Sequence, residues 1–155
     1  MAQLPDISGG PAVETIRVAV IGYGYWGPNL VRNFSGLDGC EVTAVCDRDP
    51  DSLARASRLY PAIRVTDSAE ELLSAADIDA VAIATPVSSH FELARRVIES
   101  GRHVLIEKPM TSTADEARQL IEMADAAGVV LMVDHTFLYT GAVRKIRELL
   151  DDDEL

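Results

Sequence analysis

Lys108 has the residue type and setting best suited to chemistry, and it is one of only two lysines in the chain, with Lys145. It stands between Glu107 and Pro109, directly after the apolar run 103–106, where a buried strand is expected to end. A desolvated lysine can lower its pKa and pass a proton, whereas an arginine stays charged. Pro109 also favours an extended backbone at Lys108. We therefore predict that Lys108 handles a proton or orients a substrate hydroxyl. The alternative is a surface lysine before a proline turn.

A glycine-rich loop follows the first apolar run, 16–21. Gly22, Gly24 and Gly27 have the spacing G-x-G-x-x-G, and Pro28 suits the first turn of a helix. In that context the first glycine permits a tight turn, the second lets the backbone approach a pyrophosphate, and the third allows close packing of the helix. The free N–H groups of the helix start favour an anion. The alternative is a glycine-rich turn in an unrelated α/β protein.

The aromatic residues of this loop are Tyr23, Tyr25 and Trp26. We expect them to pack against the protein rather than to serve as stacking platforms. Tyr25 and Trp26 are also expected to offer backbone N–H groups to the phosphates of a cofactor.

Asp47 lies twenty residues after Gly27, at the end of the second apolar run. An acid at this position accepts hydrogen bonds from the adenosine ribose of NAD and repels the 2′-phosphate of NADP. The neighbouring Arg48 could pair with that phosphate, so NADP stays possible while NAD is favoured. Alternatively, Asp47 is only a turn residue.

Further polar residues follow two later runs. Thr85 and Pro86 form a turn after the fourth run, and His90 falls in the first turn of the next helix, where it could line a crevice or lie on the surface. His135 follows the sixth run and could contact substrate or Lys108, or be a core histidine. No recognised zinc spacing is present, so no metal is expected.

The elements that must position these residues are apolar runs that alternate with helical patterns. Most runs are apolar on both faces, which is typical of parallel strands covered on both sides. The alternation predicts an α/β fold, a doubly wound parallel (Rossmann) sheet of about six strands with helices on both faces. The runs are 16–21, 41–46, 62–65, 80–84, 103–106 and 129–133.

Helix boundaries are predicted from capping residues. Asp49 precedes Pro50, and three Ser/Thr–Glu pairs have capping-box spacing; glycines are placed to end two helices. The last pattern, 141–150, predicts an amphipathic helix. The capping pairs are Ser68/Glu71, Ser89/Glu92 and Thr113/Glu116, and the helix-ending glycines are Gly101 and Gly128.

Composition narrows the class of protein. The net charge is -11 and 48% of residues are hydrophobic, which argues against nucleic acid and anionic membranes as partners. Cys40 and Cys46 would lie roughly 20 Å apart along one strand, too far for a disulfide, so a reducing, cytoplasmic setting is expected. No apolar run is long enough to span a membrane. Residues 1–14 predict a flexible tail without signal-peptide features, and 15–155 a single dinucleotide-binding domain.

Taken together, the motifs resemble those of the Gfo/Idh/MocA oxidoreductases. The matching segments occur in family order from Ile16 to Leu150, and the combination of the glycine loop with "EKP" is specific. "WGPN" and "HTFLY" are most similar to members that act on nucleotide-linked sugars. The segments are "VIGYGYWGPN", "CDRDP", "AVAIATPVSSH", "HVLIEKPM" and "LMVDHTFLYTGAVRKIRELL".

This resemblance implies reversible NAD(P)-linked oxidation of a sugar, cyclitol or nucleotide-sugar hydroxyl, with Lys108 as the catalytic hydroxyl-orienting or proton-relay group. Family members continue into a second α+β domain that supplies substrate contacts, a catalytic histidine and the oligomer interface; this chain resembles the cofactor half alone, and a homo-oligomer is possible. The alternative function is a non-catalytic cofactor sensor of the same fold. The residues implied to bind the cofactor are Gly22, Gly24, Gly27, Asp47, Thr85, Pro86, Glu107 and His90.

Overall fold

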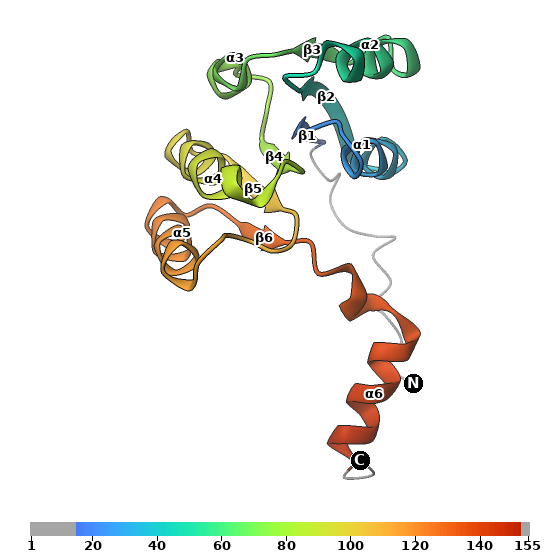
Figure 1. The fold of residues 1–155 in the computed structure, drawn as a ribbon, viewed down its shortest axis with the longest axis vertical. Helices are drawn as coiled ribbons and strands as arrows, with labels where there is room; N and C mark the ends of the chain where they lie inside the picture. Colours follow the sequence, from blue (N-terminus) through green and yellow to red (C-terminus); the bar gives the residue numbers. More distant parts are fainter. Residues whose placement is uncertain (1–14, 153–155) are drawn as a thin grey trace. The chain divides into compact units, whose positions relative to one another are not determined.

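The computed structural model describes residues 15–152, so the tail predicted at 1–14 falls outside the described residues. Six strands form a sheet in the order β3-β2-β1-β4-β5-β6 (Figure 1), which is the strand order of a doubly wound dinucleotide-binding fold. The predicted fold class is confirmed. The chain divides into two compact units, one ending at Ala84 and the other beginning at Thr85.

The first unit has parallel strands, with β1 between β2 and β4 and with β3 beside β2. Its elements are β1 (Ile16–Ile21), α1 (Gly27–Ser35), β2 (Cys40–Cys46), α2 (Pro50–Leu59), β3 (Arg64–Thr66), α3 (Ala69–Ser74) and β4 (Ala80–Ile83).

Burial in this unit explains why its strands are apolar throughout. The four consecutive residues 18–21 of β1 are all buried. Because successive side chains of a strand point to opposite faces, both faces of β1 must be covered. The helices contribute Val31 from α1, Ala56 from α2 and Leu72 from α3, each fully buried.

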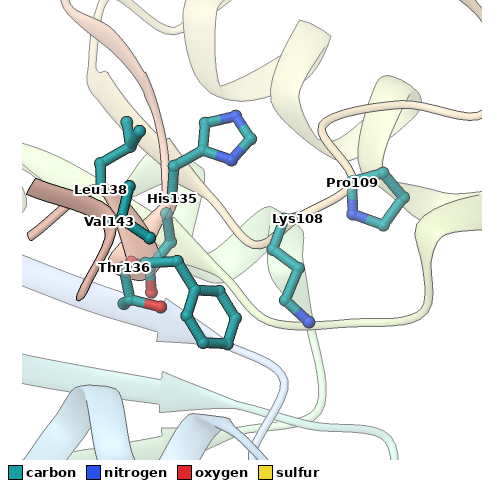
Figure 2. Close-up of a pocket in the computed structure, with 8 residues that line it drawn as sticks. Lys108, Pro109, His135, Thr136, Leu138 and Val143 are labelled. Atoms are coloured by element: carbon teal, nitrogen blue, oxygen red, sulfur yellow. The ribbon is translucent and has the colours of Figure 1, made fainter. Parts of the chain in front are cut away.

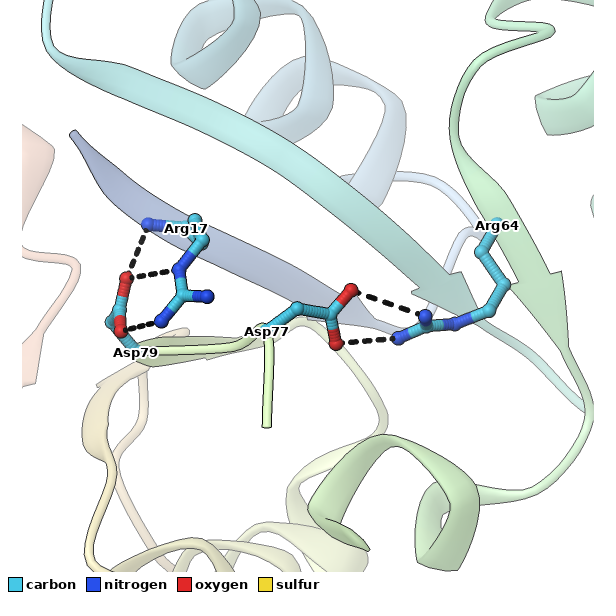
Figure 3. Close-up of polar contacts among 4 residues, drawn as sticks. All are labelled: Arg17, Arg64, Asp77 and Asp79. Atoms are coloured by element: carbon cyan, nitrogen blue, oxygen red, sulfur yellow. Dashed lines mark hydrogen bonds and ion pairs between the residues drawn. The ribbon is translucent and has the colours of Figure 1, made fainter. Parts of the chain in front are cut away.

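Two arginine–aspartate pairs hold the segment that precedes β4 (Figure 3). The Arg17 guanidinium contacts both Asp79 carboxylate oxygens at 2.7 and 2.9 Å, and the Arg17 N–H donates to Asp79 at 2.8 Å. Arg64 pairs with Asp77 at 3.2 Å, and its hydrogen bond lowers the pKa of that carboxyl. Arg17 lies at the start of β1. Its pair with Asp79 is therefore at the opposite end of this strand from the glycine loop.

The second unit contains the remaining helices and two parallel strands. Its elements are η1 (Val87–Ser89), α4 (His90–Glu99), β5 (His103–Ile106), α5 (Ala114–Ala127), β6 (Leu131–Val133), η2 (Thr136–Tyr139) and α6 (Gly141–Asp151).

Apolar side chains are covered unevenly in this unit. Val97 of α4, Ile106 of β5 and Leu120 of α5 are fully buried, whereas Met132 of β6 is 46% exposed. The predicted amphipathic helix at the end of the chain exists as α6, but it has no buried residue. No helix within residues 15–152 is long and apolar enough to cross a bilayer.

Most predicted helix ends are confirmed. Asp49 caps α2 and Ser68 caps α3, while Thr113 and Glu116 form a complete capping box on α5. The prediction for Ser89 is wrong, because its hydroxyl contacts Thr85 Oγ1 and the Pro86 carbonyl, at 2.8 and 2.7 Å, and makes no capping bond. The helix-ending glycines predicted at 101 and 128 both adopt positive φ angles.

Candidate functional site

The glycine loop joins β1 to α1 in the first unit. Gly22 has φ 98°, a left-handed conformation that favours glycine, and its N–H donates to the Cys46 carbonyl at 2.8 Å. A Cβ at Gly27 would lie 2.0 Å from the Gly22 carbonyl oxygen, so only glycine fits there. A Cβ at Gly24 would meet no atom within 4 Å. The space next to the loop is therefore filled at Gly27 and empty at Gly24.

The Asp47 carboxylate accepts a hydrogen bond from the backbone of this loop. One carboxylate oxygen accepts the Tyr23 N–H at 2.5 Å, and the other accepts the Asp49 N–H at 2.9 Å. Asp47 is thus a turn residue, as one prediction had it, and also a partner of the glycine loop. Each carboxylate oxygen has a further lone pair, so the side chain retains capacity for ligand hydroxyls. Arg48 is exposed in the same turn.

A second side chain, which sequence reasoning missed, also holds the loop. Arg55 of α2 donates to the Tyr23 carbonyl at 2.6 Å, and its guanidinium lies 5.3 Å from the centre of the Tyr23 ring. Tyr23 is fully buried, as predicted. Arg55 lies in α2 outside the quoted motifs, so the sequence held no signal for this contact.

Tyr25 and Trp26 differ from expectation. Their rings stack on each other, with centroids 6.0 Å apart, and are 91% and 37% exposed. Tyr25 therefore does not pack against the protein as predicted, whereas Trp26 remains partly covered. Trp26 is the only tryptophan of the chain and occupies the N-cap of α1.

In the second unit, His90 bridges two turns. Its Nε2 lies 2.7 Å from the Thr85 carbonyl oxygen and its Nδ1 lies 2.9 Å from the Pro109 carbonyl oxygen. The residue is 1% exposed, so the surface alternative is wrong. A carbonyl oxygen only accepts and a neutral imidazole carries one N–H, so a neutral His90 ring donates to one of these two carbonyls at a time. His90 thereby joins the Thr85–Pro86 turn to the turn that carries Lys108.

Lys108 lines a pocket of about 380 Å³ at the end of β5 (Figure 2). The Lys108 side chain is exposed to solvent. The residues described in the structure therefore do not desolvate it as predicted. His135 lines the same pocket and is also exposed, which rules out the core alternative. Figure 2 shows the Lys108 and His135 side chains pointing in different directions. The other lining residues are Pro109, Asp134, Thr136, Phe137, Leu138 and Val143.

Two acids accompany Lys108. Glu107 is only 8% exposed, and burial, together with a hydrogen bond and the negative charge of Asp134, raises its pKa to about 7. Asp134 was not predicted as a site residue, although it directly follows a strand. Within residues 15–152, no group of three or more His, Cys, Asp and Glu side chains is arranged to hold a metal ion.

The fold and the glycine loop define a dinucleotide-binding protein of the Rossmann class. Residues 16–135 match the family described as "Oxidoreductase family, NAD-binding Rossmann fold". The chain therefore belongs to the Gfo/Idh/MocA oxidoreductase family, as the sequence motifs predicted.

Individual relatives agree with this assignment. The chain is 31% identical over 140 residues to a D-apiose dehydrogenase of Paraburkholderia graminis, covering 90% of this chain and 37% of that protein. Among solved structures, it resembles GenD2 from gentamicin A biosynthesis in complex with NAD, with 32% identity and a TM-score of 0.88 over 99% of this chain and 43% of GenD2.

A third relative carries a nucleotide sugar. WlbA dehydrogenase from Bordetella pertussis, solved with NADH and UDP-GlcNAcA, is 26% identical with a TM-score of 0.84, over 92% of this chain and 41% of WlbA. A further solved relative, the 3-ketoreductase KijD10 from Actinomadura kijaniata, is in complex with NADP, so the cofactor of solved relatives is NAD in some and NADP in others. The chain spans 37% to 43% of the length of these relatives.

Proposed function

We propose that this chain is the cofactor-binding part of an NAD(P)-dependent dehydrogenase. The reaction moves a hydride between nicotinamide C4 and a hydroxyl-bearing carbon of a sugar, cyclitol or nucleotide-linked sugar. The observation that carries the proposal is the attachment of Asp47 to the glycine loop. That bond ties the acid expected at the ribose to the backbone expected at the pyrophosphate.

The cofactor roles are assigned residue by residue. Gly24 leaves open space for a pyrophosphate, with backbone N–H groups of Tyr25 and Trp26 nearby in the chain. Asp47 accepts from the adenosine ribose, which favours NAD over NADP. Arg48, exposed beside it, is the residue that would meet a 2′-phosphate.

Residues of the second unit would serve the nicotinamide half of the cofactor. Thr85 and Pro86 form a turn that His90 fixes through the Thr85 carbonyl. Glu107 and Lys108 follow β5, with Lys108 free to reach a ligand from its pocket. Lys108 orients the substrate hydroxyl and exchanges its proton, while His135 contacts the substrate.

The partners follow from the same proposal. A substrate-binding domain would cover the pocket, exclude water from Lys108 and supply the remaining substrate contacts; a homo-oligomer is compatible with this arrangement. Cys40 and Cys46 are free, which supports a reducing compartment such as the cytoplasm.

Replacing Lys108 tests the catalytic role. Lys108→Met should leave NADH binding nearly unchanged but reduce sugar oxidation by at least about a hundredfold when the substrate domain is supplied, because proton transfer is lost. NADH formation measures the rate, and Lys145→Met, which alters the only other lysine, is the matched control. Equal rates for the two variants would contradict the role and favour the sensor alternative.

A further inference from the structure

Glu107 and Asp134 occupy matching positions on neighbouring strands. In the pairing of β5 with β6, Ile106 lies opposite Val133, and the Asp134 N–H donates to the Ile106 carbonyl at 2.8 Å. Each acid is the residue that follows this pair. Their side chains therefore leave the same end of two adjacent strands, beside Lys108.

The Glu107 carboxyl lacks a donor on one side. Its Oε2 accepts the Lys108 N–H at 3.1 Å, but its Oε1 is buried and no donor among residues 15–152 reaches it. Asp134 holds the matching position on the neighbouring strand, and its carboxyl raises the pKa of Glu107. Two ionised carboxylates can only accept, so their contact is repulsive, whereas one proton converts it into a hydrogen bond.

We propose that Glu107 and Asp134 form a proton-sharing acid pair, in which Asp134 is a positioning residue that helps the buried Glu107 to hold a proton near neutral pH. The raised pKa of Glu107, about 7, has burial as its first cause and Asp134 as its second. The Lys108 backbone N–H and side-chain charge oppose this shift and do not cancel it.

The titratable side chains near the pair belong to the pocket and to the turns around it. Lys108 adjoins Glu107 and lines the pocket with Asp134 and His135. The His90 ring contacts the Thr85 and Pro109 carbonyls. With the shared proton in place, the two acids present one negative charge to the pocket instead of two, and Glu107 can act as a hydrogen-bond donor.

Carbon-13 NMR of the side-chain carboxyls tests the pair in the 155-residue chain without any ligand. One glutamate should titrate near pH 7 in the wild type and be missing in Glu107→Gln. In Asp134→Asn its midpoint should fall by about one pH unit or more, because the neighbouring negative charge is gone. Glu122→Gln, at an exposed helical position, is the control and should leave the midpoint unchanged.

Two results of the same titration would contradict the acid pair. A wild-type chain in which every glutamate titrates below pH 6, or an unchanged midpoint in Asp134→Asn, would overturn the pair. Circular dichroism checks that each variant is folded. If Asp134→Asn does not fold, Asp134→Ser replaces it, and the Glu107→Gln spectrum still decides whether the titrating group is Glu107.

A second readout rests on the proposed function. As pH rises through 7, ionised Glu107 adds a negative charge near an anionic dinucleotide, so NADH affinity should fall roughly threefold to tenfold between pH 6 and 8.5. Glu107→Gln should abolish this dependence, since it removes the titrating group, whereas Asp134→Asn should move the dependence to lower pH together with the Glu107 midpoint. A variant profile matching the wild type would contradict the pair. Absence of NADH binding at every pH would instead contradict the proposed function, and the NMR titration would still decide the pair.

Discussion

At the scale of single residues, two glycines of the same loop have different constraints. Gly27 packs so closely against the backbone that an added Cβ would lie 2.0 Å from the Gly22 carbonyl oxygen. Gly24 is surrounded by open space. Gly27 is thus required by the fold, whereas we attribute the requirement for glycine at position 24 to the ligand.

Alanine substitutions separate these two requirements. Gly27→Ala should destabilise the chain by about 1 to 3 kcal/mol through overpacking, measured by urea unfolding. Gly24→Ala should change stability by less than about 0.5 kcal/mol, yet weaken NADH binding by about tenfold or more, because the methyl group occupies the space proposed for the pyrophosphate. Normal NADH affinity in Gly24→Ala would show that this space is not the phosphate site.

At the scale of elements, helix ends differ in how firmly they are fixed. The capping box of α5 has both of its reciprocal bonds, since Thr113 accepts the Glu116 N–H and Glu116 accepts the Thr113 N–H. At α4, by contrast, Ser89 bonds to the preceding turn. Sequence spacing alone does not distinguish these cases, because both fit the same pattern.

The cap of α5 has a measurable contribution to stability. Thr113→Ala should lower the free energy of unfolding by about 1 kcal/mol, since it leaves the Glu116 N–H without its partner. Thermal unfolding measures the change, and Ser112→Ala, at the adjacent exposed position, should have little effect. Equal losses in the two variants would argue against the capping role.

At the scale of the whole molecule, the sequence predicted the strand count, the fold class and the family, because apolar runs and glycine spacing are local signals. It left open whether Lys108 is exposed, and it did not predict that Tyr25 is exposed, because exposure depends on which segments cover a residue. Arg55 and Asp134 were missed for a related reason. Their roles arise from neighbours that are distant in sequence, Tyr23 and Glu107 respectively.

The most direct test of the central claim is a titration of the purified chain with NADH and, separately, with NADPH. Trp26, the only tryptophan, lies in the glycine loop, so energy transfer from it to the reduced nicotinamide reports binding at that loop. We predict that NADH binds more tightly than NADPH and that Asp47→Asn reduces or removes the preference, whereas Asp38→Asn, at an exposed acid, retains it. Failure of both dinucleotides to bind would contradict the account.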